Sequence, residues 1–404
     1  MHCDFETSGR CVLTCGCGTR QSSRTGKTNS SEFHYWPLLN TFRNVPLAKD
    51  GCQLGIVIGM DEAGYGPNLG PLVITATVWQ VPGDPRKTDF WASLETAVSQ
   101  SATKDSDRIH VADSKEVYSP SRGIQTLERS IQTIFGLTSQ NTSSFRNLCD
   151  WLMTSDSERS PSGEFPELLR RPPAKPFENS QPGAETADMK LAPSFLDVEP
   201  WFQQTDLVLP VSNEQGEIES LSGRLGSACD DAGIRLLGIN SDIVLTERFN
   251  SVSDFYQSKG AALSRFTLGL LRSVWDPDSA EPALIIGDKH GGRSRYDELI
   301  DEQLDGQMIF RLQEGRQKSS YRVGTSEINF QTKAEEHFPV AVASMVCKYV
   351  RELSMELFNS FWKQHLPDIK PTKGYPQDAK RFRKEIVAHQ EQLGIPDSTL
   401  WRAR

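Results

Sequence analysis

The sequence has no long hydrophobic run. None of its 404 residues lies in an uninterrupted apolar stretch of about 18 residues, the length that a helix needs to cross a bilayer. The first twenty residues also lack the apolar segment of a secretory signal. These absences argue against a membrane-spanning or secreted protein, so we expect a cytoplasmic protein with no membrane association.

Positive charge is in the minority, because 44 Lys and Arg stand against 53 Asp and Glu, giving a formal net charge of −9. The chain therefore has no overall basic character, and binding of nucleic acid would have to depend on a local patch. Residues 363–384 are such a patch, with seven Lys or Arg and two Asp. Residues 314–322 (EGRQKSSYR) are a second, weaker candidate.

The eight cysteines do not have the pattern of a disulfide framework. Four lie close together near the N-terminus: Cys3, Cys11, Cys15 and Cys17. Thiolates at such short spacing can share a zinc ion, but only His34 lies nearby and the surrounding residues are polar and typical of turns. We expect residues 1–52 to be a disordered extension, with a metal site as the alternative.

Strand and helix patterns alternate along the rest of the chain, which indicates an α/β fold. Short β-rich apolar runs predict strands at 53–60, 71–79 and 234–239, and a further strand that ends at Asp288. Apolar residues at helical spacing predict helices at 90–101, 119–137, 216–233, 254–275 and in the latter part of 333–362. Residues 154–200 are rich in Pro, Ser and charge, the composition of a linker.

Acidic residues lie at the ends of segments that read as buried: Asp61, Glu62, Asp288 and either Glu335 or Glu336. A charged carboxylate at the end of a buried apolar strand costs free energy unless its charge is compensated, and a divalent cation compensates it well. Carboxylates that converge from separate strands would form an oxygen-rich site for Mg²⁺ or Mn²⁺, and two such ions can activate water against a phosphodiester. Neighbours on a regular strand face opposite sides, so Asp61 and Glu62 can share one site only where the strand ends or bulges.

Five stretches, in this order, resemble the motifs of the type II ribonucleases H (ribonuclease HII). They are GMDEAGYGPNLGPLVITA with Asp61 and Glu62, VADSKEV with Ser114 and Lys115, ALIIGDKHGG with Asp288, KAEEHFPVAVASMVCKYVRE with Glu335, and TKGYPQDAKRF with Tyr375. The resemblance covers roughly 54–135 and 233–385. Five motifs in the right order are far more specific than any one of them.

The resemblance implies a ribonuclease H-like fold, which is a mixed sheet flanked by helices with carboxylates near the sheet centre. It also implies a small helical C-terminal portion that helps to grip the substrate. We accordingly expect a domain at 53–352, interrupted by an insertion at about 136–232 of which 154–200 is linker-like, and a C-terminal portion at 353–404.

The resemblance further implies roles for individual residues. Four acids match catalytic metal ligands: Asp61, Glu62, Asp288 and Glu335. The remaining matches are to substrate contacts: the backbone of Gly64, Tyr65 and Gly66 with ribose 2′-hydroxyls, Ser114 and Lys115 with a phosphate, and Tyr375 with a sugar at the RNA–DNA junction. A contact to the 2′-hydroxyl is what distinguishes RNA from DNA.

The resemblance therefore implies an endonuclease, dependent on Mg²⁺ or Mn²⁺, that hydrolyses the RNA strand of RNA–DNA hybrids or cuts at ribonucleotides embedded in DNA. We expect it to be a monomer. Three features depart from the family pattern: Tyr65 replaces Arg, Glu replaces Asp as the fourth acid, and Lys-His-Gly-Gly rather than Gly follows Asp288. The altered acid leaves open a nucleic-acid-binding or partner-interaction protein of the same fold with weakened catalysis. A DNA-cutting nuclease of the same superfamily is a third hypothesis.

Overall fold

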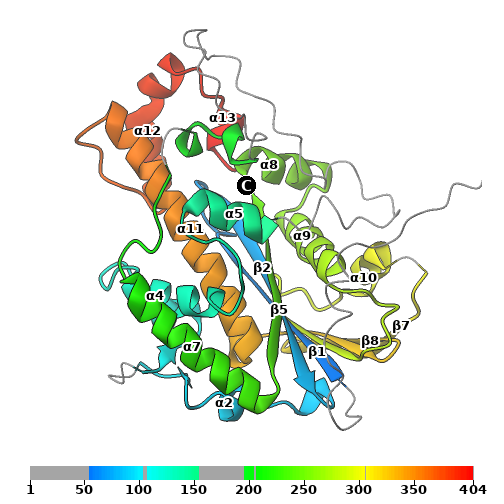
Figure 1. The fold of residues 1–404 in the computed structure, drawn as a ribbon. Coiled ribbons are helices and arrows are strands. Elements are labelled where there is room, and N and C mark those ends of the chain that lie inside the picture. The colour runs from blue at the N-terminus through cyan, green and yellow to red at the C-terminus, as the bar shows by residue number, and fades with distance from the viewer. Residues whose placement is uncertain (1–53, 103–106, 154–194, 204–205, 305, 404) are drawn as a thin grey trace, which may run out of the picture. The chain divides into compact units, whose positions relative to one another are not determined.

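The computed structural model describes residues 54–102, 107–153, 195–203, 206–304 and 306–403 (Figure 1). These described residues form one compact unit. The predicted extension at 1–52, with its cysteines, and most of the linker-like segment at 154–200 lie outside the described residues.

A mixed sheet of seven strands forms the centre of this unit. The strands are β1 (Leu54–Ala63), β2 (Leu72–Pro82), β5 (Arg235–Val244), β6 (Ala283–Asp288), β7 (Ile309–Glu314), β8 (Lys318–Val323) and β9 (Ser326–Gln331). Their order across the sheet is β5-β2-β1-β6-β9-β8-β7. β1, β6 and β9 are parallel to one another, whereas the remaining neighbours pair antiparallel.

Both faces of the central strands are buried. Successive residues of a strand point to opposite faces, so Val57 on β1 packs in one apolar cluster and Ile58 in another. β2 divides in the same way, with Trp79 in the first cluster and Val78 in the second. Burial on both faces explains why these strands read in the sequence as nearly continuous apolar runs.

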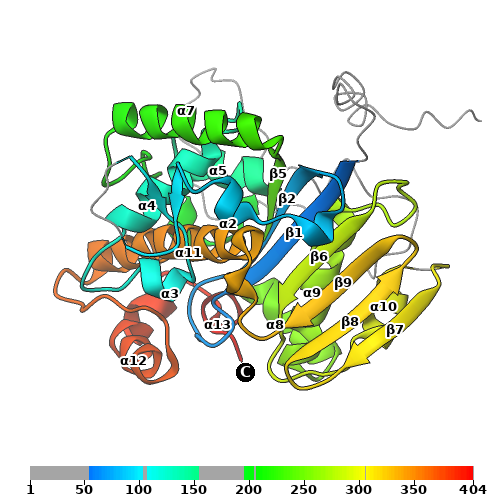
Figure 2. The ribbon, with the colours of Figure 1, turned by 90° about the horizontal axis from the view of Figure 1, so that it is seen from below.

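Helices cover both faces of the sheet (Figures 1 and 2). The first apolar cluster lies under α4 (Gln125–Phe135), α5 (Phe145–Met153), α7 (Gln215–Ala232) and α11 (Phe338–His365). The second lies under α8 (Thr246–Phe255), α9 (Lys259–Val274) and α10 (Asp297–Gln303). This arrangement confirms the predicted fold class, α/β with a mixed sheet flanked by helices.

α11 begins directly on the backbone of β1. A Cβ atom at Gly59 would lie 2.2 Å from the carbonyl carbon of Pro339, so only glycine permits this approach. The Thr77 hydroxyl of β2 donates to the Pro339 carbonyl at 2.8 Å. α11 is followed by α12 (Pro376–Gln392) and α13 (Asp397–Leu400), so the C-terminal part is helical, as predicted.

Smaller elements complete the described part of the chain: α2 (Phe90–Ser93), α3 (Ser114–Val117), a two-stranded sheet of β3 (Val98–Ser99) and β4 (Ile109–His110), and 3-10 helices at Pro85–Lys87, Phe195–Val198, Pro200–Phe202 and Ala334–Glu336. Within that part, no helix combines the length and the low polarity that a bilayer span requires.

Three predicted helices are shorter than the sequence pattern indicates. The helix predicted at 119–137 forms only as α4, over Gln125–Phe135. The helix predicted at 90–101 ends after Ser93, because the chain then pairs with β4. The helix predicted at 254–275 is divided in two. Gln257 has a left-handed φ of 50°, which interrupts the helix, and the side chain of Ser258 then caps α9.

The second basic candidate, 314–322, lies in the hairpin of β7 and β8 at the edge of the sheet, where no strand was predicted. Described parts of the predicted insertion belong to the core, because Phe145 and Phe202 lie in the first apolar cluster. The predicted boundary between 352 and 353 lies within α11, which continues unbroken across it. The domain limits themselves stay a prediction.

Candidate metal centre and substrate surface

Three carboxylates meet at one edge of the sheet. Asp61 lies near the end of β1, Asp288 is the last residue of β6, and Glu335 follows β9. Each offers one oxygen, and these oxygens all lie within 4.8 Å of one another. The cause is topological. Because β1, β6 and β9 are parallel neighbours, their carboxyl ends lie at the same edge, where open α/β sheets bind ligands.

Glu335, and not Glu336, joins the other two acids. Lys333 adopts a left-handed conformation with a φ of 56°, which turns the chain from β9 into the 3-10 helix at Ala334–Glu336. Glu336 is exposed, and its backbone carbonyl accepts a hydrogen bond from Trp91 Nε1 at 2.8 Å. The two adjacent glutamates therefore differ sharply in their surroundings.

Burial and mutual repulsion disfavour the charged forms of these acids. Burial raises the pKa of Asp61 well above its ordinary value, and the charges of Glu62 and Glu335 add to this, against a hydrogen bond with Ser344. Burial also raises the pKa of Asp288 and the pKa of Glu335. A divalent cation would offset these costs, and a donor set of carboxylate oxygens fits Mg²⁺ or Mn²⁺.

Glu62 lies on the other face of the sheet from Asp61. The pairing of β1 with β2 is regular from Leu54 to Ala63, without a bulge, so adjacent side chains alternate between the faces. Glu62 is accordingly not one of the three acids whose oxygens cluster. It remains close enough to interact with them, because burial together with the charges of Asp288 and Glu335 raises the pKa of Glu62 to about 7.

α3 brings the Asp-Ser-Lys motif close to the acids. The side chain of Asp113 caps this helix, accepting from the Lys115 backbone N–H at 3.0 Å. Lys115 Nζ lies 3.6 Å from the Asp113 carboxylate, and the lysine side chain is 83% exposed. Ser114 is buried, and its hydroxyl accepts from Ser344 Oγ at 3.2 Å. Of the predicted phosphate-contacting pair, Lys115 therefore faces solvent and Ser114 is bonded within the protein.

The charge of Asp113 also acts on the cluster, since it helps to raise the pKa of Asp288 and the pKa of Glu335. The sequence placed Asp113 in a motif without giving it a role at the site. Its proximity depends on how α3 packs on α11.

The glycine loop, residues 64–70, connects β1 to β2. Gly64 has a φ of 93°, and a Cβ atom there would lie 2.5 Å from the Pro71 carbonyl oxygen and 2.6 Å from Arg351 Nε. Only glycine fits this position. Gly66 is different, because a Cβ atom there would have no neighbour within 4 Å. The backbone at Gly66 is therefore open to a ligand.

Tyr65 packs against the second apolar cluster and contributes no positive charge. A cation nevertheless lies beside it. Lys259 Nζ, in the first turn of α9, is 6.0 Å from the centre of the Tyr65 ring, within cation–π range. Among the described residues, no carboxylate lies within ion-pair distance of Lys259. Nothing local in the sequence relates Lys259 to Tyr65, so sequence reasoning missed it.

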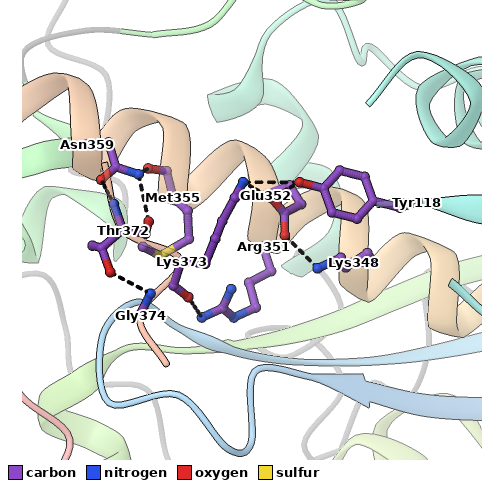
Figure 3. A network of polar contacts seen from close by, with 9 residues as sticks. All are labelled: Tyr118, Lys348, Arg351, Glu352, Met355, Asn359, Thr372, Lys373 and Gly374. Atoms are coloured by element: carbon purple, nitrogen blue, oxygen red, sulfur yellow. Dashed lines mark hydrogen bonds and ion pairs between the residues drawn. The ribbon is translucent and has the colours of Figure 1, made fainter. Parts of the chain in front are cut away.

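Tyr375 lies immediately before α12 and is 54% exposed, so it is available to a ligand. The residues before it are fixed to α11 (Figure 3). Thr372 N donates to Asn359 Oδ1 at 2.8 Å, and Asn359 Nδ2 donates back to the Thr372 carbonyl at 2.9 Å. The Gly374 carbonyl accepts from Asn68 N at 2.7 Å. Tyr375 and the glycine loop are therefore neighbours.

The basic segment 363–384 is only partly available to a ligand. Three of its seven cations form ion pairs: Lys373 with Glu352, Arg381 with Asp378 and Glu385, and Arg383 with Asp397. The other four are exposed, with no carboxylate within ion-pair distance in the described part of the chain: Lys363, Lys370, Lys380 and Lys384.

His290, two residues after Asp288, is a core histidine. It is 4% exposed, and its Nδ1 lies 2.9 Å from Ser264 Oγ. Its ring contacts the rings of Tyr296 and Phe330. Burial lowers the pKa of His290 to about 3, so it is neutral at physiological pH and unsuited to donate a proton.

A search of solved structures finds similar chains at low identity. A chain of the PCNA:RNase HII complex from Archaeoglobus fulgidus is 13% identical, with a TM-score of 0.34 over 86% of this chain and 94% of that one. Ribonuclease H2 from Pyrococcus horikoshii OT3 is 15% identical, with a TM-score of 0.33 over 85% and 92%. Bst-RNase HIII in complex with Mn²⁺ is 14% identical, with a TM-score of 0.36 over 86% and 66%.

No family model matches the sequence, and no curated protein matches it. The fold class therefore rests on the strand order and the helix placement described above.

Proposed function

We propose that this chain is a divalent-metal-dependent endonuclease with a ribonuclease H-like fold. It hydrolyses the RNA strand of RNA–DNA hybrids or cuts at ribonucleotides embedded in DNA. The observation that carries the proposal is the convergence of Asp61, Asp288 and Glu335 within 4.8 Å at the carboxyl edge of the sheet. The motifs that suggested the ribonuclease HII resemblance supply these three acids from separate parts of the chain.

The chemistry of the donor set fits Mg²⁺ or Mn²⁺, which Asp61, Asp288 and Glu335 would hold. When bound, such an ion lowers the pKa of water and stabilises the leaving oxygen of a phosphodiester. Glu62 approaches the same acids from the other face of the sheet and completes the negative field that attracts the cation. Lys115, exposed beside them, supplies a charge for a phosphate oxygen.

The substrate is selected by features next to this cluster. The open backbone at Gly66 allows close approach of a sugar, and a contact to its 2′-hydroxyl would favour ribose over deoxyribose. The exposed Tyr375 ring offers a surface on which the neighbouring sugar stacks. Lys259 and the four exposed lysines of 363–384 would attract the phosphate backbone. The protein acts as a monomer in this proposal.

One assay tests the proposal. The purified protein and Asp61→Asn are incubated in Mg²⁺ or Mn²⁺ with three substrates: a DNA duplex carrying one ribonucleotide, an RNA–DNA hybrid and an all-DNA duplex of the same sequence. We expect cleavage confined to the two ribose-containing substrates, and its loss in Asp61→Asn.

The other outcomes distinguish the remaining hypotheses. Tight binding without cleavage in either metal would refute the enzyme and favour a binding protein of the same fold. Cleavage of the all-DNA duplex would favour a DNA nuclease without ribose selection. The clustering of Glu335 with Asp61 and Asp288 favours a metal-dependent nuclease over a binding protein with weakened catalysis, since the longer fourth acid still reaches the other two.

A further inference from the structure

The glycine loop (64–70) directly contacts the segment 372–375, which ends at Tyr375. The backbone N–H groups of Asn68 and Leu69 both donate to the Gly374 carbonyl, at 2.7 and 3.3 Å. Gly374 has a φ of 80°, and a Cβ atom there would lie 2.4 Å from the Leu69 carbonyl oxygen. Two segments far apart in the sequence thus form one continuous surface.

One buried side chain of α11 bonds to both segments. Arg351 Nη2 donates to the Leu69 carbonyl and to the Lys373 carbonyl, each at 3.2 Å. Arg351 is 2% exposed and cannot contact a ligand from solution. It also fills the space beside Gly64, where its Nε lies 2.6 Å from the position of an added Cβ atom. The glycine loop therefore packs directly against the Arg351 side chain.

Other side chains of α11 hold the segment 372–375 in place (Figure 3). Glu352 accepts from Lys373 Nζ at 2.5 Å, from Lys348 Nζ at 2.6 Å and from the Tyr118 hydroxyl at 2.7 Å. The Asn359 side chain bonds to both backbone groups of Thr372, its N–H and its carbonyl. These bonds hold the segment 372–375 in place on α11. Arg351 bonds to this segment and to the glycine loop, so it holds the loop in place relative to the segment.

We propose that Arg351 is a positioning residue that fixes the glycine loop relative to Tyr375 and thereby sets the preference for ribose. The inference rests on the proposed function, in which the loop backbone contacts the 2′-hydroxyl and Tyr375 stacks on the adjacent sugar. Recognition of a 2′-hydroxyl by backbone atoms requires a fixed spacing between the loop and Tyr375, because a small displacement of either one weakens the contact to the hydroxyl.

The test compares Arg351→Met, Arg351→Lys and the wild type. The affinity for a single-ribonucleotide duplex and for the matching all-DNA duplex is measured without divalent metal, so that no cleavage occurs. Hydrogen exchange is followed in peptides that cover 64–70 and 372–375. We expect Arg351→Met to reduce the ribose preference by about tenfold or more and to raise exchange in both segments. Mn²⁺ affinity, measured by calorimetry, stays unchanged because the three carboxylates are not touched.

Arg265→Met is the matched control. Arg265 is also largely buried, with its side chain 15% exposed, and it forms two hydrogen bonds to Glu302, at 2.9 and 2.6 Å. This variant loses a well-bonded arginine that joins α9 to α10, and we expect its ribose preference to stay within about twofold of the wild type.

A folded Arg351→Met with an unchanged ribose preference would overturn the positioning role. If that variant does not fold, Arg351→Lys decides, because the lysine side chain is one bond shorter than the path to Nη2, so its ammonium does not reach both carbonyl oxygens. We expect it to lose about threefold or more of the preference, and an unchanged preference would refute the role. A wild type that shows no ribose preference would instead refute the proposed function, while the exchange measurements still report whether Arg351 couples the two segments.

Discussion

Replacing Glu352 by Gln tests how strongly α11 holds the segment before Tyr375. Burial by itself would raise the pKa of Glu352, but the charges and hydrogen bonds of Lys348, Lys373 and Tyr118 outweigh it and hold the pKa at about 2, below the ordinary value of 4.5. The difference corresponds to about 3 kcal/mol of stability at neutral pH. This is an upper bound, because the Lys373 side chain is 46% exposed and water screens its charge.

This contribution depends on pH in a defined direction. Between pH 4.5 and about 2, the unfolded chain binds a proton at Glu352 that the folded protein does not bind, so the free energy of unfolding falls as the pH falls. About 1.4 kcal/mol of the contribution is lost by pH 3.5. Glu352→Gln cannot titrate, and its deficit relative to the wild type should therefore shrink as the pH is lowered.

Urea unfolding of both proteins at pH 7 and at pH 3.5 measures this difference. Glu385→Gln is a matched control, because Glu385 pairs with Arg381 at the surface with its side chain 43% exposed, and we expect its loss to stay below about 0.5 kcal/mol. A deficit for Glu352→Gln below about 1 kcal/mol at pH 7, or one that does not change with pH, would refute the reasoning.

Three further outcomes are expected. Glu335→Gln should lower cleavage by more than about 100-fold, whereas Glu336→Gln, the same change one residue away, should stay within about twofold of the wild type; equal losses would contradict the assignment of Glu335. Lys259→Gln should weaken duplex binding uniformly and reduce the slope of log affinity against log salt by about 1, and an unchanged slope would exclude a phosphate contact. Glu199 is buried with a pKa raised to about 7, so the folded state binds a proton between pH 4.5 and 7 that the unfolded chain releases, and stability falls as the pH rises through this range. Glu199 accepts from both Trp201 Nε1 and the Thr246 N–H, and Glu199→Gln keeps an acceptor oxygen for only one of them. The stability of this variant relative to the wild type should nevertheless rise by up to about 3 kcal/mol between pH 4 and pH 8, because only the wild type titrates, and an unchanged difference would contradict this.

Much of the architecture follows from local patterns. The β1–β2 hairpin, β6 and the helix α7 lie where the sequence predicts them, because each has a clear apolar period and a terminating signal such as Gly233, which ends α7 in a left-handed conformation. A helix prediction failed where the spacing of apolar residues alone was misleading. The pattern at 254–275 continues through Gln257, but the backbone turns there and begins a new helix.

The edge strand β7 was missed for a different reason, and its neighbours β8 and β9 were not predicted either. Most residues of β7 are exposed, so its side chains lack the apolar alternation that identifies a half-buried strand. Pairing with β8, which packs against β9, defines this strand instead.

The sequence by itself placed Asp61, Glu62 and Asp288 at the ends of apolar segments, left the choice between Glu335 and Glu336 open, and identified the loop whose glycines permit close approach. Only the tertiary structure decided how these features combine. Parallel pairing of β1, β6 and β9 brings Asp61, Asp288 and Glu335 to one edge of the sheet, and the pleat of β1 sends Glu62 to the other face. Arg351 joins the glycine loop to the Tyr375 segment through α11. These relations hold between residues far apart in the chain, so packing sets them and no local pattern records them.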